Sequence, residues 1–105
     1  MEFDWDPDEQ ENGNTAKIAR RYDADEVEYV LEHADPLVLT KRATADTRQG
    51  PETRFRVVGE DALGDLMTVV FCRRKGRIRP LSAFPTTDDW EIAIYQRGQP
   101  PASLS

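Results

Sequence analysis

The chain has little of what disulfide-rich, metal-binding or membrane-spanning proteins need. Its one cysteine, Cys72, excludes an internal disulfide and a thiolate metal cluster, and its one histidine, His33, has no paired ligand nearby in the sequence. No apolar run approaches the roughly 18 residues of a membrane span. The start, MEFDWDPDEQ, is acidic where a signal peptide is basic and then apolar. We therefore expect a cytoplasmic protein without membrane contact, metal or cofactor.

Apolar residues are also scarce, at 38% of the 105 residues, whereas charged residues make up 32%. This composition suits one small domain with a well-solvated surface. We expect that domain to span residues 1–98. The remaining residues 99–105, QPPASLS, are predicted to be disordered from their composition.

Charge is distributed unevenly along the chain. Residues 1–35 contain twelve acids and three bases, a net of −9, whereas residues 36–84 contain ten bases and five acids, a net of +5. The net charge of the whole chain is −6. The asymmetry predicts one acidic and one basic surface. The alternative is that the acids are only the solvated faces of helices.

The first third of the chain predicts one short strand and two helices. Phe3 and Trp5 alternate with acids, as in a half-buried strand. Asp6 followed by Pro7 is typical of a helix N-cap and first helical position, which predicts a helix over residues 7–22. A second helix is predicted from residue 23 or 24 to just before Asp35-Pro36, because a residue that precedes proline resists helical geometry.

Antiparallel strands follow. The polar segment 43–52 predicts a mobile loop between the first two of them, and a last helix begins after Thr86 or Thr87. Segregated elements of this kind predict an α+β domain, an antiparallel sheet of three to four strands with two N-terminal helices and one C-terminal helix on one face. The predicted strands are residues 37–40, 53–59, 66–73 and 77–84.

The segment from Asp65 to Phe84 contains two apolar runs joined by a basic turn at Gly76. Alternate side chains of paired strands share a face, so a hairpin here would bring several cations together where a polyanion could lie. Phosphate recognition is the first hypothesis, and the alternative is a set of solvated strand residues. The candidate RNA-binding residues are Arg73, Arg74, Lys75 and Arg77.

Several motifs in order resemble one family. They are EFDWDP, AKIARRYDADEVEYVL followed by DPLVL, RFRVVG, and LMTVVF with GRIRPLSA. This order resembles the BrnT toxins, small ribonucleases of type II toxin–antitoxin modules with a RelE-like fold, over about residues 2–95. The resemblance implies an endoribonuclease that cleaves RNA without a metal and inhibits translation. It also implies a cognate antitoxin, encoded beside it, and assembly as a homodimer or as a heterotetramer with that antitoxin.

The chemistry implied by the resemblance needs a group that takes the 2′-hydroxyl proton and cations that stabilise the phosphorane. Arginine suits the second role because its planar fork binds two phosphate oxygens. Arg54 and Arg79 match basic positions of the family strands. Lys17 is the candidate base, with Arg21 beside it. The candidate catalytic residues are Lys17, Arg21, Arg54 and Arg79.

Two departures from the family pattern favour an alternative function. The family has histidine and glycine where this chain has Arg21 and Tyr22, and arginine where this chain has Phe84. The alternative is a catalytically degenerate RelE-like binding module that retains only an antitoxin or another protein partner. A general DNA-binding protein is a third reading. It has the least support, because no helix is rich in Arg, Lys and Asn.

The cysteine and four of the aromatic residues can each be explained by a structural role as well as by a functional one. Cys72 lies in the apolar run MTVVFC and is read as a packed side chain, because a reactive thiol needs an electropositive and partly exposed setting. Trp5, Phe55, Phe71 and Trp90 are spaced as core or sheet-face residues, and base stacking is the alternative.

Overall fold

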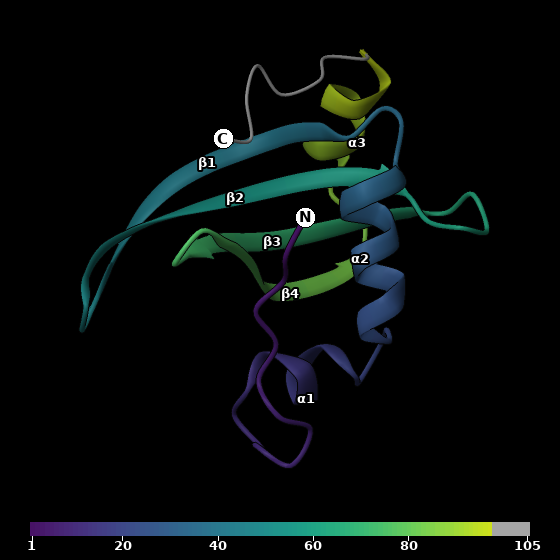
Figure 1. Cartoon of the computed structure of the whole chain (residues 1–105). Helices are drawn as coiled ribbons and strands as arrows, with labels where there is room; N and C mark the ends of the chain where they lie inside the picture. The colour runs from purple at the N-terminus through teal and green to yellow at the C-terminus, as the bar shows by residue number, and fades with distance from the viewer. Residues whose placement is uncertain (98–105) are drawn as a thin grey trace.

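A four-stranded sheet carries helices on both of its faces (Figure 1). The computed structural model describes residues 1–97, so the predicted disordered tail lies outside the described residues. The predicted α+β class is confirmed, with two N-terminal helices and one C-terminal helix. The elements are α1 (Asn14–Ile18), α2 (Ala24–His33), β1 (Val38–Thr47), β2 (Gly50–Glu60), β3 (Leu66–Arg74), β4 (Arg77–Pro85) and α3 (Asp89–Gln96).

The sheet is an antiparallel meander in the order β1-β2-β3-β4. The β3–β4 hairpin pairs Arg74 with Arg77 across a two-residue turn. Both turn residues have positive φ, 52° at Lys75 and 77° at Gly76, as a tight hairpin turn requires. The predicted basic hairpin is therefore present.

One sheet face packs against α2. Val27, Val30 and Leu31 follow helical spacing along α2 and are buried. They join a core cluster with alternate residues of the central strands, among them Val57 and Val69, which are opposite each other. The helix lies close to β2 because Gly59 has no side chain: a Cβ there would lie 3.2 Å from a methyl carbon of Val30 and 2.5 Å from the Cβ of Ala34.

The opposite face binds α3, so the expectation that all helices share one face is wrong. Glu91 of α3 is fully buried there and accepts hydrogen bonds from Thr40, Thr68 and Arg56. Thr68 alternates with core residues along β3 and therefore points away from α2. The sequence pattern missed this second layer because the one fully buried side chain of α3 is the acidic Glu91.

The N-terminal segment differs from the predicted strand and long helix. Phe3 forms a single parallel bridge to Ile78, and the backbone N–H of Asp4 donates to the carbonyl of Ile78 at 2.8 Å. Turns precede α1, which covers only Asn14–Ile18 of the predicted residues 7–22. The Asp6 carboxylate accepts the backbone N–H of Asn14 at 2.9 Å, so it caps this short helix instead of beginning a long one.

The predicted mobile loop at residues 43–52 is wrong, because β1 and β2 continue as a paired hairpin to Thr47 and Gly50. The hairpin extends beyond the helices (Figure 1). Its outer residues are polar because no layer covers them there, so apolar alternation gave no signal for a strand. The last helix also begins later than predicted, with Asp88 as its N-cap. Within residues 1–97, no helix is both long enough and apolar enough to cross a membrane.

Candidate functional site

Three of the four candidate catalytic residues line one hollow on the α3 face of the sheet, near the β4 edge. The hollow measures about 270 Å³ and is formed by segments that are far apart in the sequence. A second hollow, of about 480 Å³, shares Lys17, Leu81 and Ser82 with it and adds Arg20 and Arg21. We call the first one the β4 hollow; its lining is Asn12, Asn14, Lys17, Arg54, Val70, Arg79, Leu81 and Ser82.

Strand register explains why Arg54 and Arg79 share a face. Arg54 of β2 pairs with Cys72 of β3, and Cys72 pairs with Arg79 of β4, so all three side chains stand in one row. Neighbouring strands are about 4.8 Å apart, which places the two arginines about 10 Å from each other along this row. That arrangement lets two guanidinium groups approach one extended anion.

Cys72 is the middle residue of this row and is fully buried. Burial, the largest cause, raises the pKa of the Cys72 thiol to about 11. The thiol is therefore uncharged near neutral pH, and the predicted structural role fits this environment better than nucleophilic catalysis.

Arg79 is held by carboxylates of the N-terminal segment. Its Nη2 lies 2.7 Å and its Nη1 3.1 Å from the two Asp6 carboxylate oxygens, and Nη1 lies 3.4 Å from a carboxylate oxygen of Asp4. Only 13% of the Arg79 side chain is exposed. Hydrogen bonding to Asp6 is the main cause that raises the pKa of Arg79, and the same bond lowers the pKa of Asp6. Arg79 therefore fixes the N-terminal segment against β4 while it lines the β4 hollow.

Arg54 and Lys17 are more available for a ligand than Arg79. Arg54 is 46% exposed and forms one contact with Glu52, 3.2 Å from Nε to the carboxylate. Lys17 is exposed and has no ion pair within residues 1–97. Arg21 lies in the turn that follows α1, where its backbone N–H donates to the carbonyl of Ile18 at 2.9 Å. Lys17 and Arg21 both line the second hollow.

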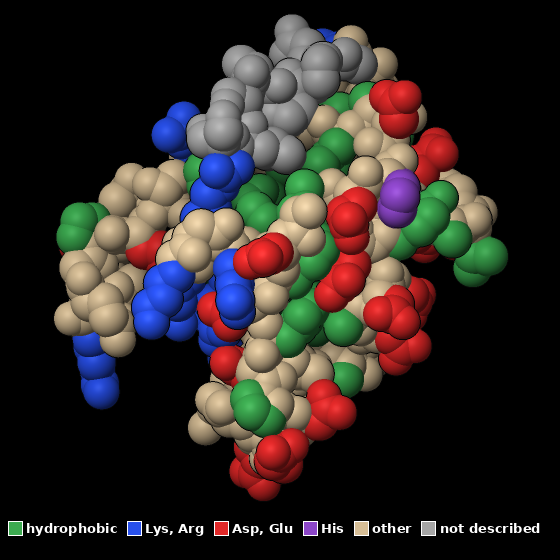
Figure 2. Space-filling view, viewed as in Figure 1, with side chains coloured by type: hydrophobic (Ala, Val, Ile, Leu, Met, Phe, Trp, Pro, Cys, Tyr) green, Lys and Arg blue, Asp and Glu red, His purple; other side chains and the backbone are tan. Residues whose placement is uncertain are grey.

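The four candidate RNA-binding residues surround the β3–β4 turn and are all exposed. Arg74 and Arg77 form exposed ion pairs, at 3.9 Å with Glu52 and 3.4 Å with Glu2, and such pairs contribute little to stability. Figure 2 shows Lys and Arg side chains gathered beneath the β1–β2 hairpin, whereas Asp and Glu side chains lie over α2 and the N-terminal segment. The predicted separation into a basic and an acidic surface is present on this face.

Arg56 has a structural role that the sequence did not reveal. It donates through Nε and Nη2 to Glu91 at 2.7 and 2.8 Å, and its guanidinium lies 5.0 Å from the Phe84 ring centroid. It also lies 5.4 Å from the ring centroid of Trp90, which is 45% exposed. Arg56 therefore fastens α3 to the sheet, and Phe84 supplies part of its packing.

Other candidates occupy structural positions. The ring of His33 lies 5.2 Å from that of Tyr29 on α2, and the indole N–H of Trp5 donates to Glu28 at 2.7 Å. Phe55 and Phe71 are buried and stack on each other with centroids 5.2 Å apart. In the part of the chain that the structure describes, no three His, Cys, Asp or Glu side chains cluster closely enough to hold a metal ion.

The chain was compared with protein-family models, with curated proteins and with solved structures, and none of the three comparisons found a match.

Proposed function

We propose that this protein binds single-stranded RNA across the β4 hollow and acts as the toxin component of a type II toxin–antitoxin module, cleaving RNA as an endoribonuclease. One observation carries the proposal. Lys17 from α1, Arg54 from β2 and Arg79 from β4 gather around one hollow. Arg54 and Arg79 match basic positions of the BrnT toxins, and Lys17 is the candidate base. Phosphate groups are the natural ligands of such a cluster.

The proposed reaction is attack of a ribose 2′-oxygen on the neighbouring phosphorus. The new bond joins the 2′-oxygen to phosphorus and the bond to the 5′-oxygen breaks, which leaves a 2′,3′-cyclic phosphate. Lys17 is the proposed general base that takes the 2′-hydroxyl proton, and the departing 5′-oxygen takes a proton from solvent. Arg54 stabilises the charge that develops on the phosphoryl oxygens.

A second candidate function is a catalytically degenerate binding module that retains only an antitoxin or another protein partner. The observation that favours it is the pairing of Arg79 with two carboxylates, Asp6 and Asp4, which neutralises a cation that a phosphate would otherwise meet. The two functions share the same fold and differ in whether RNA is cut.

An RNA-cleavage assay separates the two functions. The purified protein is incubated with free and with ribosome-bound messenger RNA, and products are tested for 2′,3′-cyclic phosphate ends. We expect Arg54→Ala and Lys17→Ala each to lower the cleavage rate by about a hundredfold, the scale of losing one transition-state contact or a catalytic base. Arg48→Ala is the matched control, because Arg48 is an exposed arginine that does not line the β4 hollow.

Growth arrest on expression, lost in Arg54→Ala but not in Arg48→Ala, would support the toxin function in cells. Intact RNA in every reaction, together with co-purification of the product of an adjacent gene, would contradict the nuclease and select the binding module. Arg79→Ala is a poorer test, because it leaves Asp6 unpaired and loosens the N-terminal segment whatever the function is.

A further inference from the structure

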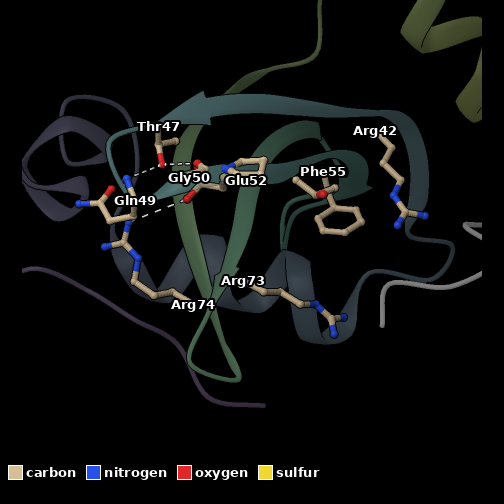
Figure 3. A pocket seen from close by; sticks show the side chains of 10 residues that line it. Arg42, Thr47, Gln49, Gly50, Glu52, Phe55, Arg73 and Arg74 are labelled. Atoms are coloured by element: carbon tan, nitrogen blue, oxygen red, sulfur yellow. Dashed lines mark hydrogen bonds and ion pairs between the residues drawn. The ribbon is translucent and has the colours of Figure 1, made fainter.

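A third hollow lies where the two hairpins of the sheet separate. The last pair between β2 and β3 is Arg54 with Cys72, yet β1–β2 pairing continues to Thr47 and Gly50 and β3–β4 pairing to Arg74 and Arg77. The two hairpins therefore form the arms of a fork. A hollow of about 370 Å³ occupies the fork (Figure 3), lined by Arg42, Thr47, Gln49, Gly50, Pro51, Glu52, Thr53, Phe55, Arg73 and Arg74.

This fork hollow carries positive charge that the fold leaves unpaired. Arg42 and Arg73 are exposed and form no ion pair within residues 1–97. Arg74 shares its one carboxylate, Glu52, with Arg54. Three guanidinium groups thus line the hollow beside a single acid, and an anionic ligand would find donors there without displacing an internal pair.

The floor of the fork hollow is aromatic and fixed. Phe55 is only 6% exposed and is stacked on Phe71, with an angle of 20° between the ring planes. Arg42 pairs with Phe55 across β1 and β2, and its guanidinium lies 5.4 Å from the Phe55 ring centroid. Arg73 is two residues beyond Phe71, so it shares that face of the sheet. A cation is therefore held over a rigid apolar surface.

Glu52 of the fork hollow contacts one arginine of each hollow. Its carboxylate lies 3.2 Å from Arg54, which lines the β4 hollow, and 3.9 Å from Arg74, which lines the fork hollow. Arg42, Phe55 and Arg73 lie on the opposite face of the sheet from Arg54. Glu52 and Arg74 alternate with them and share the face of Arg54, so the lining of the fork hollow includes side chains of both faces. One extended polyanion could follow this line of cations from one hollow to the other.

We propose that the fork hollow is a second RNA subsite, in which Arg42 and Arg73 bind phosphates of the same strand at a distance from the β4 hollow. This inference rests on the proposed function, because it extends the path of the RNA bound there. The subsite adds affinity only for a strand long enough to reach both hollows. The subsite selects RNA by strand length and backbone charge, because guanidinium groups that contact phosphates do not distinguish base sequences.

The test uses fluorescein-labelled single-stranded RNA of about four and about twelve nucleotides, lengths that bracket one and several nucleotide-binding positions. In the Arg42→Ala/Arg73→Ala variant, we expect affinity for the longer strand to fall about tenfold and affinity for the shorter strand to stay unchanged. The slope of log affinity against log salt should decrease by roughly 1.4 for the longer strand, since each phosphate contact on a single strand contributes about 0.7.

Two further variants control for charge. Arg48→Ala/Arg97→Ala removes the same charge from exposed positions that line neither hollow, and it should bind both strands as the wild type does. Arg42→Lys/Arg73→Lys keeps the charge and should restore the salt slope. Circular dichroism confirms that every variant is folded.

The outcomes separate failure of the subsite from failure of the proposed function. If the wild type binds both strands and the alanine pair behaves as the control pair does, the subsite is wrong and the β4 hollow stands. If the wild type binds neither strand, RNA binding and the subsite are both wrong. Poly-glutamate is a third probe. If the Arg42→Ala/Arg73→Ala variant loses affinity for poly-glutamate but keeps its affinity for the longer RNA, the fork hollow is an acidic-peptide site and the inference is overturned.

Discussion

Replacing Glu91 should destabilise the domain more than any other single change of charge on α3. Its side chain has 0% exposure and accepts four hydrogen bonds, at 2.7 and 2.8 Å from Arg56, at 2.6 Å from Thr40 and at 3.0 Å from Thr68. Glu91→Gln keeps the shape but removes the charge and turns one acceptor into a donor. Arg56 and one of the two hydroxyls then lose an acceptor, because Thr40 and Thr68 donate to different oxygens of Glu91.

The size of the effect follows from burial. Removing one partner of a buried ion pair costs about 3 to 5 kcal/mol. Arg56 is 22% exposed and keeps Asp88 at 2.8 Å, so part of its charge stays compensated and the lower end, about 3 kcal/mol, applies. A domain of this size should then lose roughly 12 to 24 °C in Tm, since each kcal/mol corresponds to about 4 to 8 °C.

Urea denaturation followed by far-ultraviolet circular dichroism measures this loss. Asp89→Asn is the matched control, because it removes one negative charge from the same helix at an exposed position. It should change stability by less than about 0.5 kcal/mol. If Glu91→Gln and Asp89→Asn are equally stable, the buried network does not hold α3 to the sheet, and the reasoning fails. A double-mutant cycle with Arg56→Met isolates the energy of the pair.

The same network sets a pH dependence. Burial alone would raise the pKa of Glu91, but hydrogen bonds from Arg56, Thr40 and Thr68 outweigh it and lower the pKa from its ordinary value of 4.5. A carboxyl group whose pKa is lower in the folded than in the unfolded protein stabilises the fold. This stabilisation is fully present above the pKa of the unfolded state and is lost as pH falls through the pKa of the folded state. The difference in stability between wild type and Glu91→Gln should therefore be constant at neutral pH and should shrink below about pH 4.5.

Three further changes test separate contacts. Asp6→Asn weakens the clamp on Arg79 and should cost about 2 kcal/mol in urea denaturation, whereas an unchanged midpoint would show that the clamp adds nothing. Gly59→Ala places a Cβ 2.5 Å from the Ala34 Cβ and should cost about 1 to 3 kcal/mol. Adding Ala34→Gly should restore stability, and failure to do so would rule out the clash. Cys72, buried and with its pKa raised to about 11, should react with a thiol reagent only after urea unfolds the protein; rapid reaction of the folded protein would contradict its burial.

The elements that could be predicted from sequence are those whose apolar residues face a packed layer. α2, β3 and β4 have clear periodicity because each buries one face in the core, and the Lys75–Gly76 turn has local chemistry that fixes its type. The outer β1–β2 hairpin has no such signal, because its side chains meet solvent. The short α1 was overestimated because acids and Pro7 favoured a helix start that Asp6 does not provide.

The candidate site was partly predictable for the same reason. Alternation along paired strands places Arg54 and Arg79 on one face, so their convergence follows from strand order and register. The pairing of Arg79 with a carboxylate does not follow from strand order or register. The contact between Asp6 and Arg79 joins residues 73 positions apart, and nothing in local sequence indicates that a carboxylate of the N-terminal segment reaches that strand.

The net charge of −6 gives a poor description of the surface that a ligand meets. Several carboxylates are already paired within the fold. Glu91 forms an ion pair with Arg56, and Asp6 and Asp4 both pair with Arg79. Figure 2 shows Asp and Glu side chains over α2 and the N-terminal segment, away from the fork, whereas Glu52 lines the fork hollow itself. Because exposed charges beyond about 10 Å are largely screened at 0.1 M salt, the local cations of the fork determine binding there more than the distant acids do. Low salt should therefore strengthen RNA binding, because the contacts between phosphates and the arginines of the hollows are then screened least, and an affinity that does not rise as salt is lowered would contradict those contacts.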